Sequence, residues 1–129
     1  MFPDVKIVKT GSITAEMVKY MTNTFLATKV SFANEMKMIC DELNIDYDKV
    51  VEYSTYDERL GKSHWAVPGP DGKLGFGGSC FPKDINALID ICYKMEIPAK
   101  TIFGAWETNL EVRPEQDWKE LKVRAVTDE

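Results

Sequence analysis

Apolar side chains recur at helical spacing over residues 14–43. The positions, three, four or seven residues apart, are Met17, Met21, Phe25, Phe32, Met36, Ile39 and Leu43. This pattern is typical of one face of an amphipathic α-helix. Thr14 is the predicted N-cap, and Glu16 falls in the first turn, where the helix dipole favours an acid. A helix of about 30 residues would be roughly 45 Å long, too long for a domain of this size to cover alone, so we expect another chain to pack against it.

Three shorter helices are predicted after the long one. They cover residues 47–53, a segment that begins at Pro82, and residues 99–112. The apolar face of the helix that begins at Pro82 is formed by Ile85, Leu88, Ile89, Cys92 and Met95. Residues 61–79 hold six glycines and two prolines, which predict a long loop of the kind that is usually functional or disordered. Residues 4–9 alternate in part like a short strand, but one strand makes no sheet, so the predicted fold class is all-α with one glycine-rich loop.

Composition and charge narrow the range of functions. The 129 residues are enough for one domain, and the net charge of −5 argues against nucleic-acid binding and gives no reason for docking on an anionic membrane. No apolar run approaches the roughly 20 residues that span a bilayer, and the N-terminus lacks a signal peptide's apolar stretch, so we expect a cytoplasmic protein. The three cysteines form no CxxC pair, and there is one histidine, so neither a disulfide framework nor a metal site is expected.

The residues with candidate chemistry lie between Gly75 and Asp84. Their sequence is Gly-Phe-Gly-Gly-Ser-Cys-Phe-Pro-Lys-Asp. Glycines let the backbone approach a ligand closely, and proline favours the first turn of a helix, so Cys80 should lie at or just before a helix N-terminus. There the dipole, the free N–H groups and Lys83 would stabilise a thiolate, the nucleophilic form of cysteine. Asp84 is about one turn further on, where a carboxylate can orient or deprotonate a water.

Other interpretations of these residues stay open. The glycine-rich stretch could be a structural turn with Cys80 as a small buried filler, whereas Cys40 and Cys92 fall on apolar sides of helices, where cysteine behaves as a small hydrophobe. A cysteine–histidine hydrolase using Cys80 and His64 would need a third group to orient the imidazole, and none is obvious. A dinucleotide-binding GxGxxG would require glycine at the position of Cys80 and a preceding strand, so no such fingerprint is present.

Three blocks of sequence, spread over residues 10–105, carry a family resemblance. They are the Gly75–Asp84 block, Asp57-Glu58-Arg59-Leu60-Gly61, and the long-helix positions Ala15-Glu16-Met17-Val18-Lys19-Tyr20, Asn23, Phe25-Leu26-Ala27 and Asn34-Glu35. In kind and order they resemble the UDP-glucose/GDP-mannose dehydrogenase family. The resemblance implies an NAD-dependent oxidation of the C6 hydroxyl of a nucleotide sugar to a carboxylate. In that chemistry a cysteine forms a thiohemiacetal and then a thioester, which water hydrolyses.

The resemblance implies a catalytic role for four residues. Cys80 is the expected nucleophile, and Asp84 helps to position or activate the water. Lys19 and Asn23 match the family's lysine and asparagine. Their i, i+4 spacing puts both on one helix face, where an ammonium and an amide can stabilise oxyanions. Considered by itself, Lys19 would instead be a solvated surface lysine.

Three further positions match substrate-binding residues of the family. Phe76 and Gly77 match loop positions that contact the sugar nucleotide. Arg59 matches an arginine that reaches the sugar nucleotide of the partner subunit, and a guanidinium suits an anionic ligand through its fork of donors. Without the resemblance, Arg59 could simply pair with Asp57 or Glu58 at the surface.

The resemblance also implies what this chain lacks and what completes it. The family's NAD-binding domain and its third domain are absent, so residues 1–11 are interpreted as a remnant or linker, 12–112 as the helical central domain and 113–129 as a charged extension. No residue here is assigned to the cofactor NAD, and the chain alone is expected to be inactive. We expect a homodimer through residues 14–43. UDP-glucose is the expected substrate, with GDP-mannose or a UDP-linked amino sugar open, and a non-catalytic helical dimerisation module is the alternative function.

Overall fold

A computed structural model describes residues 10–119 of the chain and shows helices without strands over that range. The elements are α1 (Thr10–Glu42), α2 (Tyr47–Ser54), the short 3-10 helix η1 (Glu58–Leu60), α3 (Cys80–Lys94) and α4 (Lys100–Val112). The predicted all-α fold and the order of its helices are therefore confirmed. The strand expected over residues 4–9 lies outside the described residues.

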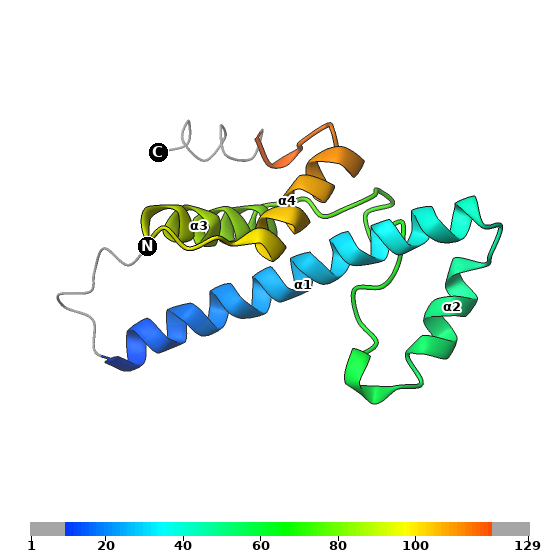
Figure 1. Ribbon diagram of the computed structural model, residues 1–129, viewed down its shortest axis with the longest axis horizontal. Helices are drawn as coiled ribbons and strands as arrows, with labels where there is room; N and C mark the ends of the chain where they lie inside the picture. Colours follow the sequence, from blue (N-terminus) through cyan, green and yellow to red (C-terminus); the bar gives the residue numbers. More distant parts are fainter. Residues whose placement is uncertain (1–9, 120–129) are drawn as a thin grey trace.

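The long helix α1 organises the fold (Figure 1). Helices α3 and α4 pack against it and against each other, and α2 folds back from its C-terminal end. The loop over residues 61–79 separates η1 from α3 and starts beside α1, because the Lys29 ammonium donates to the Leu60 carbonyl at 2.8 Å. This arrangement brings the start of α3 close to the N-terminal half of α1.

The predicted start of α1 is wrong by four residues. The helix begins at Thr10, four residues before the predicted start at Thr14, so Thr14 is no N-cap and Glu16 lies beyond the first turn. The helix runs through Gly11, because one glycine lowers helix stability by only about 1 kcal/mol and does not end a helix by itself. Glu16 instead accepts a hydrogen bond from the Tyr20 hydroxyl at 3.3 Å.

Two hydrophobic clusters form the interior. The first joins Ala27 of α1 with Phe76, Ile85 and Ala105, and so links α1, the loop, α3 and α4. The second joins Ala33, Cys40, Tyr47 and Val67 on the side of α2. Cys40 is buried, as expected for a packing residue, and Cys92 is half-buried.

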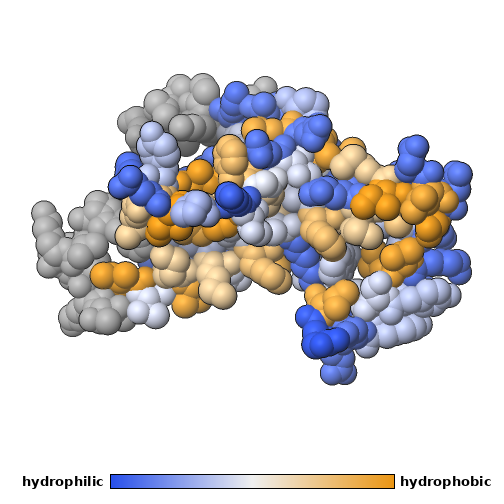
Figure 2. All heavy atoms as spheres, in the orientation of Figure 1, coloured by the Kyte–Doolittle hydropathy of each residue, from blue (hydrophilic) through white to orange (hydrophobic). Residues whose placement is uncertain are grey.

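Most of the apolar stripe of α1 faces away from these clusters, and Met36 is the member that packs against the second one. Phe25 is 63% exposed and Phe32 53% exposed, and Met17, Met21, Ile39 and Leu43 are exposed as well. Figure 2 shows hydrophobic side chains at the surface along α1. The positions that α1 buries are mostly small or polar, namely Tyr20, Thr24, Ala27, Lys29, Ser31, Ala33, Asn34 and Cys40. Among the described residues, no helix is long and apolar enough to cross a membrane.

Polar contacts fix the second cluster around Trp65. The Tyr47 hydroxyl donates to the Trp65 carbonyl at 2.6 Å, and burial raises the pKa of Tyr47 to about 12, which keeps this donor protonated. The Trp65 indole donates to the Gly61 carbonyl, and the Lys29 ammonium lies 5.0 Å from the centre of its ring. Burial lowers the pKa of Lys29. These contacts attach the turn that carries Arg59 to the side of α1.

Candidate active site

Cys80 is the first residue of α3 and is exposed. The helix was expected to begin at Pro82, but it begins two residues earlier, and the proline then occupies its first turn, where a missing N–H costs no helical bond. Ser79 is at the N-cap and makes no capping hydrogen bond. Its hydroxyl lies 4.0 Å from the Cys80 sulfur. The thiol is thus at the positive end of a helix dipole and open to a ligand.

Asp84 lies one turn after Cys80 and is fully buried. Its Oδ2 atom accepts a hydrogen bond of 2.7 Å from the side-chain amide of Asn23 on α1. Its Oδ1 atom has no hydrogen-bond partner among the described residues, and the Lys83 ammonium is 3.9 Å away. A buried carboxylate oxygen without a donor is costly, so this atom is suited to accept a hydrogen bond from a bound water or ligand.

The two predicted residues of α1 differ in their surroundings. Asn23 is half-buried at the α1–α3 contact, whereas Lys19, one turn earlier, is exposed. Tyr20 was not predicted as a site residue, but it is buried and lies within electrostatic range of Asp84. The pKa of Tyr20 is raised, most of all by burial. The charge of Glu16, the hydrogen bond between Tyr20 and Glu16, and the charge of Asp84 raise it further. Its position three residues before Asn23, on the same side of the helix, was the available signal.

Arg59 is not brought to Cys80 within this chain. Its guanidinium pairs with Asp57 at the surface, with Nη2 2.6 Å from Oδ2 and Nε 3.0 Å from Oδ1. The side-chain hydrogen bonds from Arg59 lower the pKa of Asp57. The Asp57 carboxylate also accepts from the Arg59 backbone N–H at the start of η1. The short helix η1 therefore presents the Arg59 side chain to solvent, where it is 89% exposed.

Phe76 and Gly77 belong to a loop that packs against α4 and is hydrogen-bonded to it. Phe76 is buried and packs against Phe81 and Trp106. The Asn109 side chain, itself fully buried, accepts from the Phe76 N–H at 2.7 Å and donates to its carbonyl at 3.0 Å. A Cβ atom added at Gly77 would collide with the guanidinium of Arg113. The loop has glycine here because its backbone lies directly on that side chain.

Arg113 was not expected to be part of the site. Its side chain is 2% exposed and donates to Asp71 at 2.6 Å, to Asp117 at 2.8 Å and to the Leu74 carbonyl at 3.2 Å. Burial acts to lower the pKa of Arg113, but its hydrogen bonds to the two carboxylates outweigh this effect and raise it. The hydrogen bond from Arg113 lowers the pKa of Asp71. The guanidinium thus joins the end of α4 to the loop ahead of Cys80.

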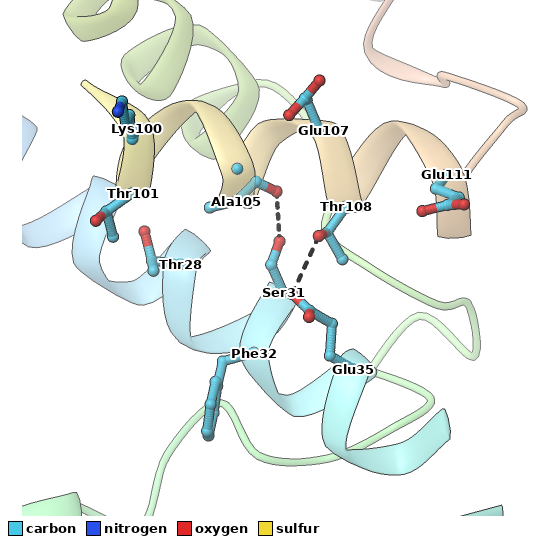
Figure 3. Close-up of a pocket in the computed structure, with 11 residues that line it drawn as sticks. Thr28, Ser31, Phe32, Glu35, Lys100, Thr101, Ala105, Glu107, Thr108 and Glu111 are labelled. Carbon is cyan, nitrogen blue, oxygen red and sulfur yellow. Dashed lines mark hydrogen bonds between the residues drawn. The ribbon is translucent and has the colours of Figure 1, made fainter. Parts of the chain in front are cut away.

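Two of the cavities formed by residues 10–119 lie beside α1, and one of these two adjoins the glycine-rich loop. It has a volume of about 400 Å³ and is lined by His64, Asp71, Gly77 and Phe81, among others. The His64 ring is 5.8 Å from the ring of Phe81, the residue after Cys80. The other, about 590 Å³, is a groove between α1 and α4 (Figure 3), and no predicted site residue lines it. Within residues 10–119, no three His, Cys, Asp or Glu side chains meet as metal ligands.

The chain matches one protein family and is similar in sequence to several named proteins. Residues 13–111 match the central domain of the UDP-glucose/GDP-mannose dehydrogenase family. The chain is 42% identical over 103 residues to the UDP-glucose 6-dehydrogenase TuaD of Bacillus subtilis, covering 80% of this chain and 21% of that protein. It is 37% identical over 110 residues to the UDP-glucose 6-dehydrogenase of Rickettsia typhi, covering 85% and 24%. A third relative, the UDP-glucose 6-dehydrogenase AglM of Haloferax volcanii, is 45% identical over 83 residues, covering 64% and 18%. The matched region is thus about a quarter or less of each relative.

Proposed function

The chain belongs to the UDP-glucose/GDP-mannose dehydrogenase family as its central domain, and from this we propose that it supplies the catalytic cysteine of a nucleotide-sugar 6-dehydrogenase. The observation that carries the proposal is the Asn23–Asp84 hydrogen bond of 2.7 Å, which joins two helices one turn away from an exposed Cys80. A buried carboxylate held by an amide beside a helix-terminal thiol is a geometry suited to covalent catalysis with water as second reactant.

Cys80 acts as the nucleophile in this proposal. Its thiolate attacks the carbonyl carbon of a sugar aldehyde, a C–S bond forms, and the carbonyl electron pair moves to the oxygen. The resulting oxyanion takes up a proton to give the thiohemiacetal. Lys19, exposed one turn before Asn23, is the cation that we assign to stabilising the oxyanion.

Asp84 and Asn23 act on the later hydrolysis of the thioester. The free Oδ1 atom of Asp84 accepts a proton or hydrogen bond from the attacking water, while Asn23 fixes the other oxygen. Water adds to the thioester carbonyl, the C–S bond breaks, and the Cys80 thiolate leaves with a carboxylic acid as product. Asn23 therefore serves mainly to orient Asp84, and its second amide hydrogen is available to the substrate.

The oxidation steps require NAD, which accepts hydride in this family. Within residues 10–119 there is no strand–glycine loop–helix unit of the kind that binds dinucleotides. We therefore assign no cofactor-binding residue to the described part of the chain. The 129-residue chain by itself is expected to be inactive, with NAD bound by another part of the enzyme.

The second part of the proposal concerns the substrate and a second copy of the chain. We assign Arg59, on its exposed turn, and the loop residues Phe76 and Gly77 to binding the nucleotide sugar, with UDP-glucose as the substrate that the relatives' names suggest. GDP-mannose is the alternative within the family. The outward apolar stripe of α1 is assigned to a homodimer interface. In such a dimer the Arg59 guanidinium would reach the partner's ligand, either after its ion pair with Asp57 breaks or with that ion pair intact.

The alternative function is a non-catalytic helical dimerisation module, which the exposed stripe of α1 favours. The two functions differ in the reactivity of Cys80. We expect Cys80 to react with iodoacetamide at neutral pH at least about threefold faster than the same cysteine in a peptide of residues 76–84, because the peptide lacks the helix that stabilises a thiolate. Mass spectrometry assigns the label, and Cys80→Ser removes the fast reaction. Equal rates in the chain and the peptide would favour the dimerisation module.

A further inference from the structure

The first turn of α3 carries no cap of its own. Ser79 occupies the N-cap position, but its side chain makes no hydrogen bond to the helix backbone. An uncapped helix start leaves its first N–H groups unsatisfied and frays. By contrast, the Asp46 side chain caps α2 by accepting from two backbone N–H groups. The start of α3 must be held by something outside the helix if Cys80 is to keep a fixed position.

The support comes from the far end of α4. Two residues before Cys80, the Gly78 N–H donates to the Asp117 carboxylate at 3.1 Å. The same carboxylate accepts from Arg113 at 2.8 Å. Gly77 lies so close to the network that an added Cβ atom would collide with the Arg113 guanidinium and the Asp117 carboxylate unless they moved. Gly77 and Gly78, which precede Ser79 and Cys80, are therefore both held by the Arg113–Asp117 ion pair and its hydrogen bonds.

We propose that Arg113 and Asp117 are positioning residues for Cys80. Neither contacts the thiol in the structure. They hold Gly77 and Gly78, the residues before the N-cap Ser79, and so fix the direction in which the chain enters the first turn of α3. The inference rests on the proposed function, in which Cys80 is the nucleophile. It adds that the nucleophile is held from a segment that lies 33 to 37 residues later in the sequence.

The geometry of the network requires arginine. The guanidinium donates from Nε to Asp117, from Nη2 to Asp71 and from Nη1 to the Leu74 carbonyl. These directions match the fixed fork of an arginine, whereas a lysine has one compact ammonium that cannot reach all three acceptors. Arg113→Lys therefore keeps the charge and loses the positioning, which separates the two effects.

The test uses the full 129-residue chain and the labelling rate of Cys80. The variants are Arg113→Lys and Asp117→Ala. Asp90→Ala is the matched control, because Asp90 makes an i, i+4 ion pair with Lys94 towards the other end of α3. Labelling of the buried Cys40 in the same samples reports loss of the fold. We expect both network variants to slow Cys80 labelling by about two- to fivefold, the size of a helix-terminus effect on an adjacent charge, with Asp90→Ala unchanged and Cys40 protected throughout.

The other outcomes overturn the inference, except that loss of the fold in Arg113→Lys alone leaves the decision to Asp117→Ala. If Cys80 of the unaltered chain reacts fast and both variants match it, the positioning role is wrong and the proposed function stands. If the unaltered chain reacts no faster than the peptide of residues 76–84, both fail. If Cys80 labels as fast in Arg113→Lys as in the unaltered chain, the positive charge at residue 113 is sufficient, and the positioning role of the guanidinium is wrong. If Arg113→Lys exposes Cys40, Asp117→Ala decides, because that side chain is partly exposed. Exposure of Cys40 in both variants would show that the network supports the whole fold.

Discussion

The two faces of α1 are reversed relative to those of an ordinary surface helix: the face with small and polar side chains is buried, and the face with large apolar side chains is exposed. The inward face, which meets α3 and α4, carries Tyr20, Thr24, Ala27, Ser31 and Asn34, all of them buried. The outward face carries large apolar side chains that are exposed, with Phe25 at 63% and Phe32 at 53%. An amphipathic helix of a monomer normally buries its apolar stripe. Here the helix buries small and polar groups within its own chain.

The inward face uses its small and polar side chains to bring helices close and to make specific contacts. The Ser31 hydroxyl donates to the Ala105 carbonyl of α4 at 2.7 Å, and Asn23, at the edge of this face, donates to Asp84 of α3. Ala27 leaves space for Ile85 and Phe76. A contiguous apolar face without cover marks an interaction surface. The comparison teaches that α1 gives one face to the candidate site, while its other, apolar face is left uncovered by the described residues.

The largest expected effect comes from removing volume on the inward side. Ile85 is fully buried against Ala27, so Ile85→Ala should lower the free energy of unfolding by about 2–5 kcal/mol. Phe25→Ala, on the outward face, should change it by only about 0.5 kcal/mol, as for a surface residue. Urea denaturation at a concentration where the chain is monomeric compares the two. Equal losses would mean that the outward stripe is part of the monomer's core.

A smaller effect is expected at the polar contact between α1 and α3. Asn23→Ala leaves the buried Asp84 carboxylate without its donor, which should cost about 1–3 kcal/mol of unfolding free energy. The matched control is Asn86→Ala, where an exposed asparagine loses a bond to the Pro82 carbonyl. Thermal denaturation measures both variants. If Asn23→Ala loses no more unfolding free energy than Asn86→Ala, the hydrogen bond from Asn23 does not stabilise the buried Asp84 carboxylate.

The candidate site shows which parts of a fold can be read from the chain. Cys80 and Asp84 lie in one block, so a proline and a glycine run were enough to put the thiol at a helix start. The contact between Asn23 and Asp84 joins residues 61 positions apart, and only family resemblance pointed to both. Helical spacing showed that α1 has an apolar face, but spacing does not say whether that face is covered by the same chain.

Arg113 shows why the rest could not be predicted. Its place beside Pro114, at the start of a charged stretch, predicted an exposed extension, because charged residues are seldom fully buried unless they are paired. Its partners are Asp71, which is 42 residues earlier, and Asp117. Nothing in the local pattern signals a pairing across that distance. The same holds for Asn109, whose two bonds to the Phe76 backbone depend on how α4 crosses the loop.

The smallest expected effect is the acid dependence of this network. Hydrogen bonding to Arg113 lowers the pKa of Asp71. Burial acts to raise the pKa of Asp117, but hydrogen bonds from Arg113 and the Gly78 N–H outweigh it, and the pKa is lowered. Carboxylates with lowered pKa values stabilise the fold fully above their unfolded value of about 3.9 and lose this contribution as the pH falls through the folded values.

Unfolding free energy should therefore decline below about pH 4 because of these two groups. Asp117→Asn removes one of them, so the variant should be less stable at neutral pH and less sensitive to acid. Urea denaturation between neutral and acidic pH measures the difference. If the acid limbs of the variant and the unaltered chain run parallel, Asp117 does not contribute to the pH dependence.

The division of α1 between a site and an interface is tested most directly by the mass of the chain in solution. Sedimentation velocity should give twice the chain mass of 14.7 kDa. Phe25→Lys should shift it to the monomer with unchanged helical circular dichroism, whereas Tyr93→Lys, the same kind of change at an exposed aromatic of α3, should leave the dimer intact. A monomer at every concentration, or a dimer that Phe25→Lys leaves intact, would contradict the assignment of the outward face to a second copy.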